Sequence, residues 1–209
     1  MCKNSMGVYR RFSLKELIEQ IGEEKVNDIL SNFSCPLNRD VEYFLHHRAV
    51  QFSKSALAPT HLVFCDVGET DSLILVGYFT LTTKAFSIPR DIFSNTQYRK
   101  VKSFSIGDSI DGNLTVPAPL IAQLGKNYTD GADCLISGND LIGIALMEIE
   151  KIQLIAGGRI CYVECEDKKP LLEFYTRQGF QEFQRRLLDK DEKKNLSGKE
   201  LIQLLRYKK

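Results

Sequence analysis

The order in which helical and strand-like segments follow one another limits the fold of this chain more than any other feature of its sequence. Apolar residues at helical spacing mark the first part of the chain, and runs rich in β-branched and aromatic residues then alternate with shorter helical patterns. The strand-like segments are residues 60–67, 71–88, 116–128, 159–167, 180–188 and 200–208. This order predicts a mixed α/β layout.

Local signals place the helices. Ser13 and Glu16 have the spacing of a capping box at the start of a helix, and Asn38 is a candidate cap for a single helix within residues 37–54. Further helices are predicted from Leu141 onward and over residues 170–178. The segment 89–115 is polar, contains glycines and has no sustained period, so it predicts an insertion or a mobile flap.

Composition favours an ordinary intracellular domain. The 209 residues suit one domain, or one domain with an appendage. No apolar run approaches the roughly 18–20 residues of a membrane-spanning helix, and the N-terminus has no apolar core of the signal-peptide type. The six cysteines are scattered without a C-x-x-C pair, which predicts reduced thiols in a cytoplasmic protein. The three histidines are not spaced like a metal-binding set, so no metal is expected.

Charge is nearly balanced overall but uneven along the chain. The net charge is +1, whereas residues 185–209 hold nine Lys and Arg against four Asp and Glu. Residues 98–102, YRKVK, form a smaller basic group. Both segments are read either as solvated surface or as contacts for a phosphate-rich ligand or RNA.

One loop has the features of an anion cradle. The strand that ends near residue 128 is followed by a loop with Gly138 and Gly143 and then by a helix. Backbone N–H groups at a helix start point outward, and the helix dipole favours negative charge there. Two glycines at this spacing also occur in many ordinary loops, so the segment by itself leaves both interpretations open.

Tyr175 lies in the stretch LLEFYTRQGF, where a plain core helix would accept Phe. A phenol titrates near pH 10, so it stays protonated at neutral pH and can give a proton to a departing thiolate. The structural alternative is that Tyr175 packs like its neighbour Phe174, with its hydroxyl group in water.

These segments together resemble the GNAT superfamily, the Gcn5-related N-acetyltransferases. The stretch EFYTRQGF is similar to the late helix-and-strand motif of that family, LIAQLGKNY to its fourth strand, and SGNDLIGIALMEI to its coenzyme A loop and helix. The earlier stretches FSCPLNRDVEYFLHHRAVQF, THLVF and LVGYFTLTT are similar to the branch that includes tRNA-acetylating bacterial toxins. The resemblance covers residues 33–208, so residues 1–32 are expected to form a helical extension ahead of the domain at 33–209.

The resemblance implies a fold and a cosubstrate. The fold is an α/β GNAT fold with a mostly antiparallel sheet splayed between its fourth and fifth strands, helices on both faces, and extra N-terminal helices. Acetyl-CoA would lie in the splay. Its pantetheine arm would meet backbone groups of Leu124, Gly125 and Lys126, and its pyrophosphate would meet the N–H groups of Gly138, Asn139, Asp140, Leu141, Ile142 and Gly143. The family loop usually reads Q/R-x-x-G-x-G/A, and Gly138 and Leu141 depart from it.

The resemblance also implies an activity. An amine would attack the thioester directly, one N–H of the fourth strand would polarise its carbonyl, and Tyr175 would protonate the leaving thiolate. The acceptor is an aminoacyl-tRNA, a protein or a small amine, and the protein is a monomer or a homodimer. Glu164 and Glu166 are candidates for the base, alongside a water relay. The alternative function is a non-catalytic GNAT-like module that binds a protein or a nucleic acid.

Overall fold

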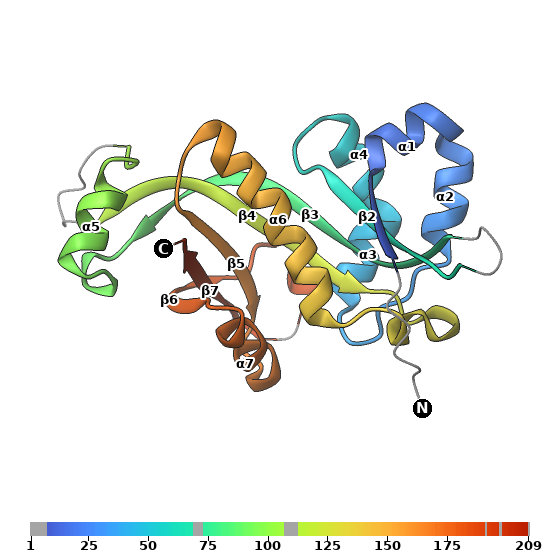
Figure 1. Cartoon of the computed structure of the whole chain (residues 1–209). Coiled ribbons are helices and arrows are strands. Elements are labelled where there is room, and N and C mark those ends of the chain that lie inside the picture. The colour runs from blue at the N-terminus through green and yellow to red at the C-terminus, as the bar shows by residue number, and fades with distance from the viewer. Residues whose placement is uncertain (1–7, 69–72, 107–112, 191, 197, 209) are drawn as a thin grey trace. The chain divides into compact units, whose positions relative to one another are not determined.

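The computed structural model describes residues 8–68, 73–106, 113–190, 192–196 and 198–208, which form a seven-stranded mixed sheet (Figure 1). The strand order is β1-β2-β3-β4-β5-β7-β6. Neighbouring strands are mostly antiparallel, and β4 and β5 are parallel. The strands are β1 (Val8–Ser13), β2 (Thr60–Asp66), β3 (Leu73–Ile88), β4 (Leu114–Lys126), β5 (Ile160–Glu166), β6 (Gln181–Leu187) and β7 (Glu200–Tyr207).

Helices fill most of the chain between the strands. They are α1 (Leu14–Ile21), α2 (Glu23–Ser31), α3 (Arg39–His47), α4 (Ala49–Lys54), α5 (Asn95–Lys102), α6 (Gly138–Ala156) and α7 (Lys169–Arg177), with 3₁₀ turns η1 (Arg90–Ile92), η2 (Thr129–Cys134) and η3 (Glu192–Lys194). The chain forms two compact units. The first unit is Met1–Leu81 with Ala122–Leu146, and the second unit is Thr82–Ile121 with Met147–Lys209.

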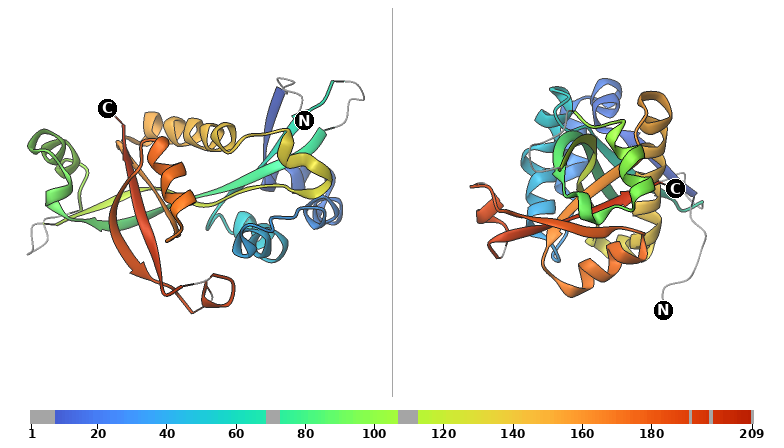
Figure 2. Two further views of the ribbon diagram at one scale, coloured as in Figure 1. Left: turned by 90° about the horizontal axis from the view of Figure 1, so that it is seen from below. Right: turned by 90° about the vertical axis from the view of Figure 1, so that its left-hand side faces the viewer.

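In the first unit, helices pack on both faces of the sheet, as the sequence resemblance implied (Figure 2, left). Successive side chains of β3 point to opposite faces. Tyr78 is fully buried, and its hydroxyl group donates to the Val41 carbonyl of α3 at 2.6 Å. Gly77, its neighbour, faces the first turn of α6, where Leu141 packs. The apolar core of this unit therefore lies between the sheet and α1–α4.

Two glycines let the layers of the first unit approach closely. A Cβ atom on Gly125 would lie 2.3 Å from Cγ1 of Val41, and a Cβ atom on Gly77 would lie 2.9 Å from the Gly125 carbonyl oxygen and 3.1 Å from Leu141. Carbon atoms pack at about 3.5–4.0 Å, so no side chain larger than hydrogen fits at either position without movement. Glycine at these positions brings α3, β3, β4 and α6 together.

In the second unit, β5, β7 and β6 form an antiparallel sheet whose core is aromatic. The ring of Phe86 lies 4.2 Å from that of Tyr162 and 5.3 Å from that of Phe183, measured between centroids. Helix α7 packs against β5 and begins with Pro170 in its first turn, where the missing N–H costs no hydrogen bond.

The predicted strands and most predicted helices are present, and five local expectations are corrected. Strand β1 was not foreseen. Ser13 lies at the start of α1 without a side-chain cap, and Arg48 divides the single helix expected within 37–54 into α3 and α4. The segment expected to lack regular structure contains η1 and α5, and Ser94 and Gln97 close a capping box on α5. Helix α6 begins at Gly138 rather than Leu141.

Two other expectations, a helix cap at Asn38 and a domain boundary at residue 32, have different outcomes. The Asn38 cap is confirmed, because its side chain accepts from the N–H groups of Asp40 and Val41. The proposed domain boundary at residue 32 stays a prediction, and residues 107–112 of the expected insertion lie outside the described residues.

We predict that Gly125→Ala destabilises the protein. The new methyl group would overlap Val41, and an overpacked core typically loses about 1–3 kcal/mol of unfolding free energy. Urea denaturation monitored by circular dichroism measures the change.

Gly143→Ala is the matched control. A Cβ atom there meets nothing within 4 Å, and replacing a mid-helix glycine with alanine typically adds up to about 1 kcal/mol of stability. Equal unfolding midpoints for the two variants would contradict the proposed overlap at Gly125.

Candidate functional site

Strands β4 and β5 pair over only part of their length. Among the described residues, the parallel register joins Leu120 to Tyr162 and Ile121 to Val163, although β4 continues to Lys126 and β5 to Glu166. Parallel strands that stay side by side keep evenly spaced hydrogen bonds along the whole overlap. The ladder between β4 and β5 is therefore short, as the sequence resemblance implied for the fourth and fifth strands.

The backbone of β4 beyond this pairing belongs to the first unit. The N–H group of Asn127, just after the strand, donates to the Val76 carbonyl of β3 at 2.9 Å. In an extended chain, neighbouring residues direct their backbone groups to opposite edges. The N–H groups of Lys126 and Leu124 are therefore expected at the edge of β4 that faces away from β3, where the thioester donors were predicted.

The side chain of Lys126 contacts two backbone carbonyls and an aromatic ring of the protein itself. Its ammonium group donates to the carbonyls of Asp133, at 2.8 Å, and Ile136, at 3.2 Å, and lies 5.6 Å from the centroid of the Tyr128 ring. Both carbonyls belong to the loop that leads into α6. Lys126 therefore holds this loop against the end of β4, and its predicted contact with coenzyme A concerns only its backbone.

Asn127 forms a buried polar junction that the sequence interpretation did not single out. Its Oδ1 accepts from the N–H groups of Ser34 at 3.0 Å and Thr129 at 3.1 Å, and its Nδ2 donates to the Leu75 carbonyl at 2.9 Å. One buried side chain thus fixes the α2–α3 loop, the start of β3 and the start of the loop that leads to α6. An Asn directly after a strand is a common turn residue, so the sequence carried no distinctive signal for it.

A carboxylate of α3 also lies beside β4. The Gln123 side-chain amide donates to Asp40 Oδ2 at 3.0 Å. Gln123 immediately precedes Leu124, the first of the predicted pantetheine contacts. Asp40 was missed because it lies far from β4 in sequence, and only the fold brings the two together.

The start of α6, the predicted pyrophosphate cradle, already has a capping group. The Ser137 hydroxyl oxygen accepts from the Asp140 N–H at 3.1 Å, and the Ser137 N–H donates to the Asp140 carboxylate at 3.1 Å. The Leu141 N–H donates to the Ser137 carbonyl at 3.1 Å. This arrangement removes the N–H groups of Asp140 and Leu141 from the predicted cradle, because both already have acceptors in Ser137. The S-x-x-D spacing in SGND was the available sequence signal.

Leu141 does not enter the loop. Its side chain is buried against Gly77, and the next residue, Ile142, is also fully buried. The leucine at this unusual position therefore anchors the first turn of α6 in the core. Gly143 leaves open space beside the helix, because a Cβ atom there would meet nothing within 4 Å.

Tyr175, the predicted general acid, lies in the second unit on α7. It is 8% exposed, and its ring is flanked by Phe174 and Phe180 with centroids at 5.1 Å and 5.7 Å. Burial, with a smaller contribution from the Cys165 thiol, raises the pKa of Tyr175 above its usual value near 10. The phenol therefore keeps its proton throughout the neutral range.

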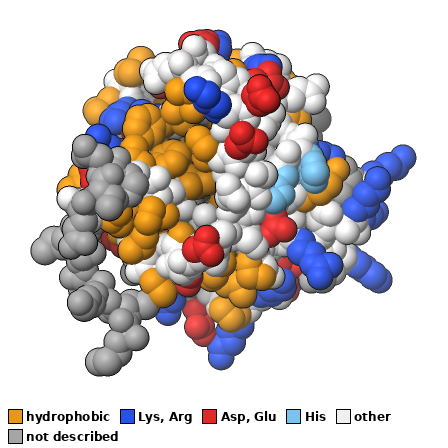
Figure 3. Space-filling model, turned by 90° about the vertical axis from the view of Figure 1, so that its right-hand side faces the viewer, with side chains coloured by type: hydrophobic (Ala, Val, Ile, Leu, Met, Phe, Trp, Pro, Cys, Tyr) orange, Lys and Arg blue, Asp and Glu red, His pale blue; other side chains and the backbone are white. Residues whose placement is uncertain are grey.

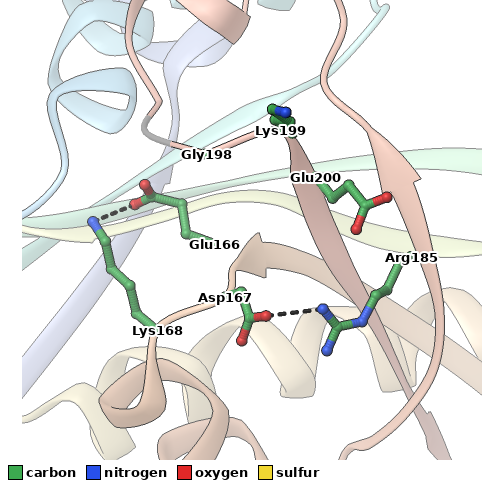
Figure 4. Close-up of a pocket in the computed structure, with 7 residues that line it drawn as sticks. All are labelled: Glu166, Asp167, Lys168, Arg185, Gly198, Lys199 and Glu200. Carbon is green, nitrogen blue, oxygen red and sulfur yellow. Dashed lines mark hydrogen bonds and ion pairs between the residues drawn. The ribbon is translucent and has the colours of Figure 1, made fainter.

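The second unit also holds a charged pocket of about 350 Å³ at the end of β5 (Figure 4). Two ion pairs line it: Lys168 with Glu166 at 2.6 Å, and Arg185 with Asp167 at 2.9 Å. The remaining lining residues are Gly198, Lys199 and Glu200. Glu166 is buried, so its charge is compensated by Lys168 rather than by water.

Glu164 is held by several donors. Arg186 donates to its Oε2 through Nε and Nη2 at 2.9 Å and 2.6 Å, and Gln203 donates to its Oε1 at 2.7 Å. Glu192 binds the same guanidinium group, and these hydrogen bonds raise the pKa of Arg186 above its usual value. The two carboxylates considered as bases, Glu164 and Glu166, therefore both have cationic partners.

The remaining predicted chemistry concerns metals, thiols and membranes. His46 and His47 are exposed on α3. The surface histidines visible in Figure 3 lie near acidic and basic side chains. Among the described residues, no three His, Cys, Asp or Glu side chains gather as metal ligands would. The five cysteines in the described part of the chain are free thiols, and Cys2 lies outside it. No helix among the described residues is both long and apolar enough to cross a membrane.

No protein-family model and no curated protein sequence matches the chain. Solved structures do match it. A tyrosine-to-phenylalanine mutant of KacT is 15% identical, with 93% of each chain covered and a TM-score of 0.59. The fold is the GNAT fold. AtaT complexed with acetyl-methionyl-tRNAfMet is 16% identical, with 93% of this chain and 94% of that chain covered and a TM-score of 0.57.

AtaTR bound with acetyl-CoA is a further structural neighbour. It is 15% identical, with 95% of this chain and 93% of that chain covered and a TM-score of 0.55. The fold that the sequence resemblance implied is therefore confirmed.

We predict that Asn127→Ala destabilises the first unit. The substitution leaves the N–H groups of Ser34 and Thr129 and the Leu75 carbonyl without their partner, and each unsatisfied buried group costs about 1–3 kcal/mol. Hydrogen exchange should become faster at the Ser34 and Thr129 amides, and the urea midpoint should fall.

Asn127→Asp is the control. It keeps the acceptor for Ser34 and Thr129, and it replaces the donor to Leu75 by a buried carboxylate oxygen that carries its own cost in stability. It should protect those two amides better than Asn127→Ala does. Equal exchange rates in the wild type and Asn127→Ala would contradict the junction.

Proposed function

We propose that the protein transfers an acetyl group from acetyl-CoA to a primary amine. The observation that carries the proposal is the incomplete pairing of β4 with β5, which leaves the end of β4 with backbone groups directed away from β3. The GNAT fold and the acetyl-CoA complex of AtaTR support the choice of cosubstrate.

The proposed reaction needs no covalent enzyme intermediate. The neutral amine attacks the thioester carbon, and a β4 N–H from Leu124 or Lys126 stabilises the oxyanion that forms. The carbon–sulfur bond then breaks, and the thiolate of coenzyme A takes a proton from the Tyr175 phenol. The nitrogen releases its proton to solvent or to a base, and Tyr175 regains a proton from solvent. The products are an amide and free coenzyme A, so the scattered cysteines have no part in the reaction.

The hydrogen-bond partners of Glu164 and Glu166 help to decide which group could be the base. Glu164 accepts hydrogen bonds from Arg186 and Gln203, and Glu166 is paired with Lys168. Both carboxylates are therefore already hydrogen-bonded to cationic side chains inside the protein. We therefore assign the proton to water rather than to Glu164 or Glu166.

The acceptor that we favour is aminoacyl-tRNA. Its support is the AtaT complex with acetyl-methionyl-tRNAfMet, whose ligand is the product of such a transfer. A protein N-terminus, a lysine side chain or a small amine are the other acceptors that the same chemistry would serve. The amine must in each case be unprotonated when it attacks.

A second candidate function is a non-catalytic module that binds a protein or a nucleic acid. The observation that favours it is the start of α6, where the Asp140 carboxylate accepts from Ser137 and brings a negative charge close to the predicted pyrophosphate contacts. The two functions differ in whether the chain binds acetyl-CoA, and this difference decides the first experiment.

We predict that acetyl-CoA raises the thermal unfolding temperature. A ligand at 100 times its dissociation constant adds about 2.7 kcal/mol of apparent stability. The measurement is differential scanning fluorimetry with acetyl-CoA up to millimolar concentration. The same titration on Asp140→Asn should show binding about fivefold tighter, because removing a like charge about 4 Å from a phosphate in water relieves roughly 1 kcal/mol.

The asparagine side chain keeps an oxygen that can accept from Ser137, so the cap itself is largely preserved. Absence of any shift for the wild type would favour the non-catalytic module. Equal affinities for the wild type and Asp140→Asn would place the pyrophosphate away from the start of α6.

We predict that Tyr175→Phe lowers kcat by about 10²–10⁴-fold and leaves the affinity for acetyl-CoA nearly unchanged, since a general acid contributes about that factor. Two structural neighbours, KacT and AtaT, have each been solved as a variant with a tyrosine replaced by phenylalanine, and the same substitution is the natural test of Tyr175. Because the pKa of Tyr175 is raised, wild-type activity should not fall through loss of its proton below about pH 10. Phe174→Leu, a change of the neighbouring ring, is the control, and an unchanged kcat in Tyr175→Phe would remove the general acid.

A further inference from the structure

The end of β4 has a different neighbour on each of its faces. Successive side chains of a strand point to opposite faces. Gly125 faces α3, because a Cβ atom there would lie 2.3 Å from Cγ1 of Val41, whereas the Lys126 ammonium group binds carbonyls of the loop that leads into α6. The main-chain donors of Leu124 and Lys126 therefore lie at an edge between an α3 face and an α6 face.

The proposed function assigns the α6 face to the cosubstrate. The predicted pyrophosphate contacts belong to the start of α6, so the pantetheine arm would reach the edge of β4 from that side. The amine must then attack a carbon that is already bound along this edge. Its approach is therefore expected from the α3 face, where a polar side chain would meet the amine first.

Asp40 places a carboxylate on the α3 face. Its Oδ2 accepts from the Gln123 side chain at 3.0 Å, and Gln123 shares this face with Gly125, two residues further along the strand. Asn38 caps α3 by accepting from the N–H groups of Asp40 and Val41, so the Asp40 carboxylate is not needed for that purpose. It is directed at β4 and is only half-buried, so solvent reaches it.

The second acid in the first turn of α3 has a different role. Glu42 accepts from the Ser34 hydroxyl group at 3.1 Å and from the Cys35 N–H at 2.6 Å. Glu42 therefore holds the α2–α3 loop, and Asp40 is the acid of this turn that faces β4.

Tyr78 of β3 lies near enough for the charge of Asp40 to affect it. Burial, with smaller contributions from Cys35 and Asp40, raises the pKa of Tyr78 well above its usual value near 10. Tyr78 therefore stays neutral and brings no positive charge to Asp40. Asp40 has a further interaction within the protein, and an ionised carboxylate can accept about four hydrogen bonds, so these contacts are compatible with an additional donor.

We propose that Asp40 binds the amino group of the acceptor and takes the proton that its nitrogen releases. The inference rests on the proposed function and deepens it, because it names the base of the reaction. After the neutral amine attacks, its nitrogen carries a positive charge in the tetrahedral adduct, and an ionised carboxylate forms a strong hydrogen bond with such a donor. The proton passes from nitrogen to the Asp40 carboxylate, and Asp40 returns it to water once the amide leaves.

The experiment compares Asp40→Asn with Glu42→Gln. Each substitution removes one negative charge from the first turn of α3, and each keeps an oxygen that can accept the present hydrogen bonds. Asp40→Asn should lower kcat/KM for the acceptor by about 10²-fold or more, since a general base contributes at least that factor, and Glu42→Gln should leave it nearly unchanged. Release of coenzyme A from acetyl-CoA is followed with aminoacylated total tRNA, a lysine-containing peptide with a free N-terminus, and spermidine.

Rescue experiments distinguish a catalytic role of Asp40 from a structural one. Asp40→Glu keeps a carboxylate and should retain more activity than Asp40→Asn. Formate added to Asp40→Ala should raise kcat, because it supplies a carboxylate in the space that the side chain leaves. A loss of rate caused by displacement of β4 would not respond to formate, so absence of rescue would overturn the inference.

Further outcomes separate this inference from the proposed function. Acetyl transfer by Asp40→Asn at the wild-type rate, or equal losses in Asp40→Asn and Glu42→Gln, would reject Asp40 as the base and leave the acetyltransferase in place. A smaller acetyl-CoA thermal shift in Asp40→Asn would trace its loss of activity to cosubstrate binding and would also reject the assignment. Absence of transfer by the wild type to all of these amines would instead reject the proposed function, and the base with it.

Discussion

The close approach of α3 to β4 at Gly125 is the constraint on which the rest of the first unit depends. With hydrogen as its side chain, Gly125 lets Val41 reach the strand, and Tyr78 then donates to the Val41 carbonyl from the neighbouring strand. On the other face, Gly77 leaves the space that Leu141 fills. The two glycines set the distances of α3 and α6 from the same pair of strands, and so fix the end of β4 between them.

Polar contacts act together with the two glycines to position the end of β4. Packing determines how near the layers lie, whereas Asn127 and Lys126 determine which backbone groups remain available beyond β3. Each side chain satisfies carbonyl or N–H groups of a loop that would otherwise lack partners. The end of β4 is thus held by side chains that are hydrogen-bonded inside the protein, and this leaves the main chain of Leu124 and Lys126 as the part suited to a ligand.

The sequence predicted the strands, the helix stops and the GNAT fold because these depend on local periodicity, glycine positions and a compact motif such as EFYTRQGF. The sequence predictions were wrong where tertiary contacts determine the local structure. Strand β1 has few apolar residues and is stabilised by pairing with β2, and α5 is short and polar and depends on its capping box. For the candidate site, the sequence proposed Gly138 and Tyr175, and their roles stay predictions. The Asp40–Gln123 contact, the Asn127 junction and the partners of Glu164 join residues that are distant in sequence, so no spacing rule could indicate them.

The carboxylate at the start of α6 has a consequence for ligand selection. Asp140 satisfies the Ser137 groups and supplies the negative charge that the helix dipole favours, so a small anion such as inorganic phosphate gains little by settling there. A larger molecule can still do so if a long uncharged portion binds elsewhere and offsets the repulsion. The first turn of α6 is therefore a poor site for a free anion, and a ligand bound there needs a second point of attachment.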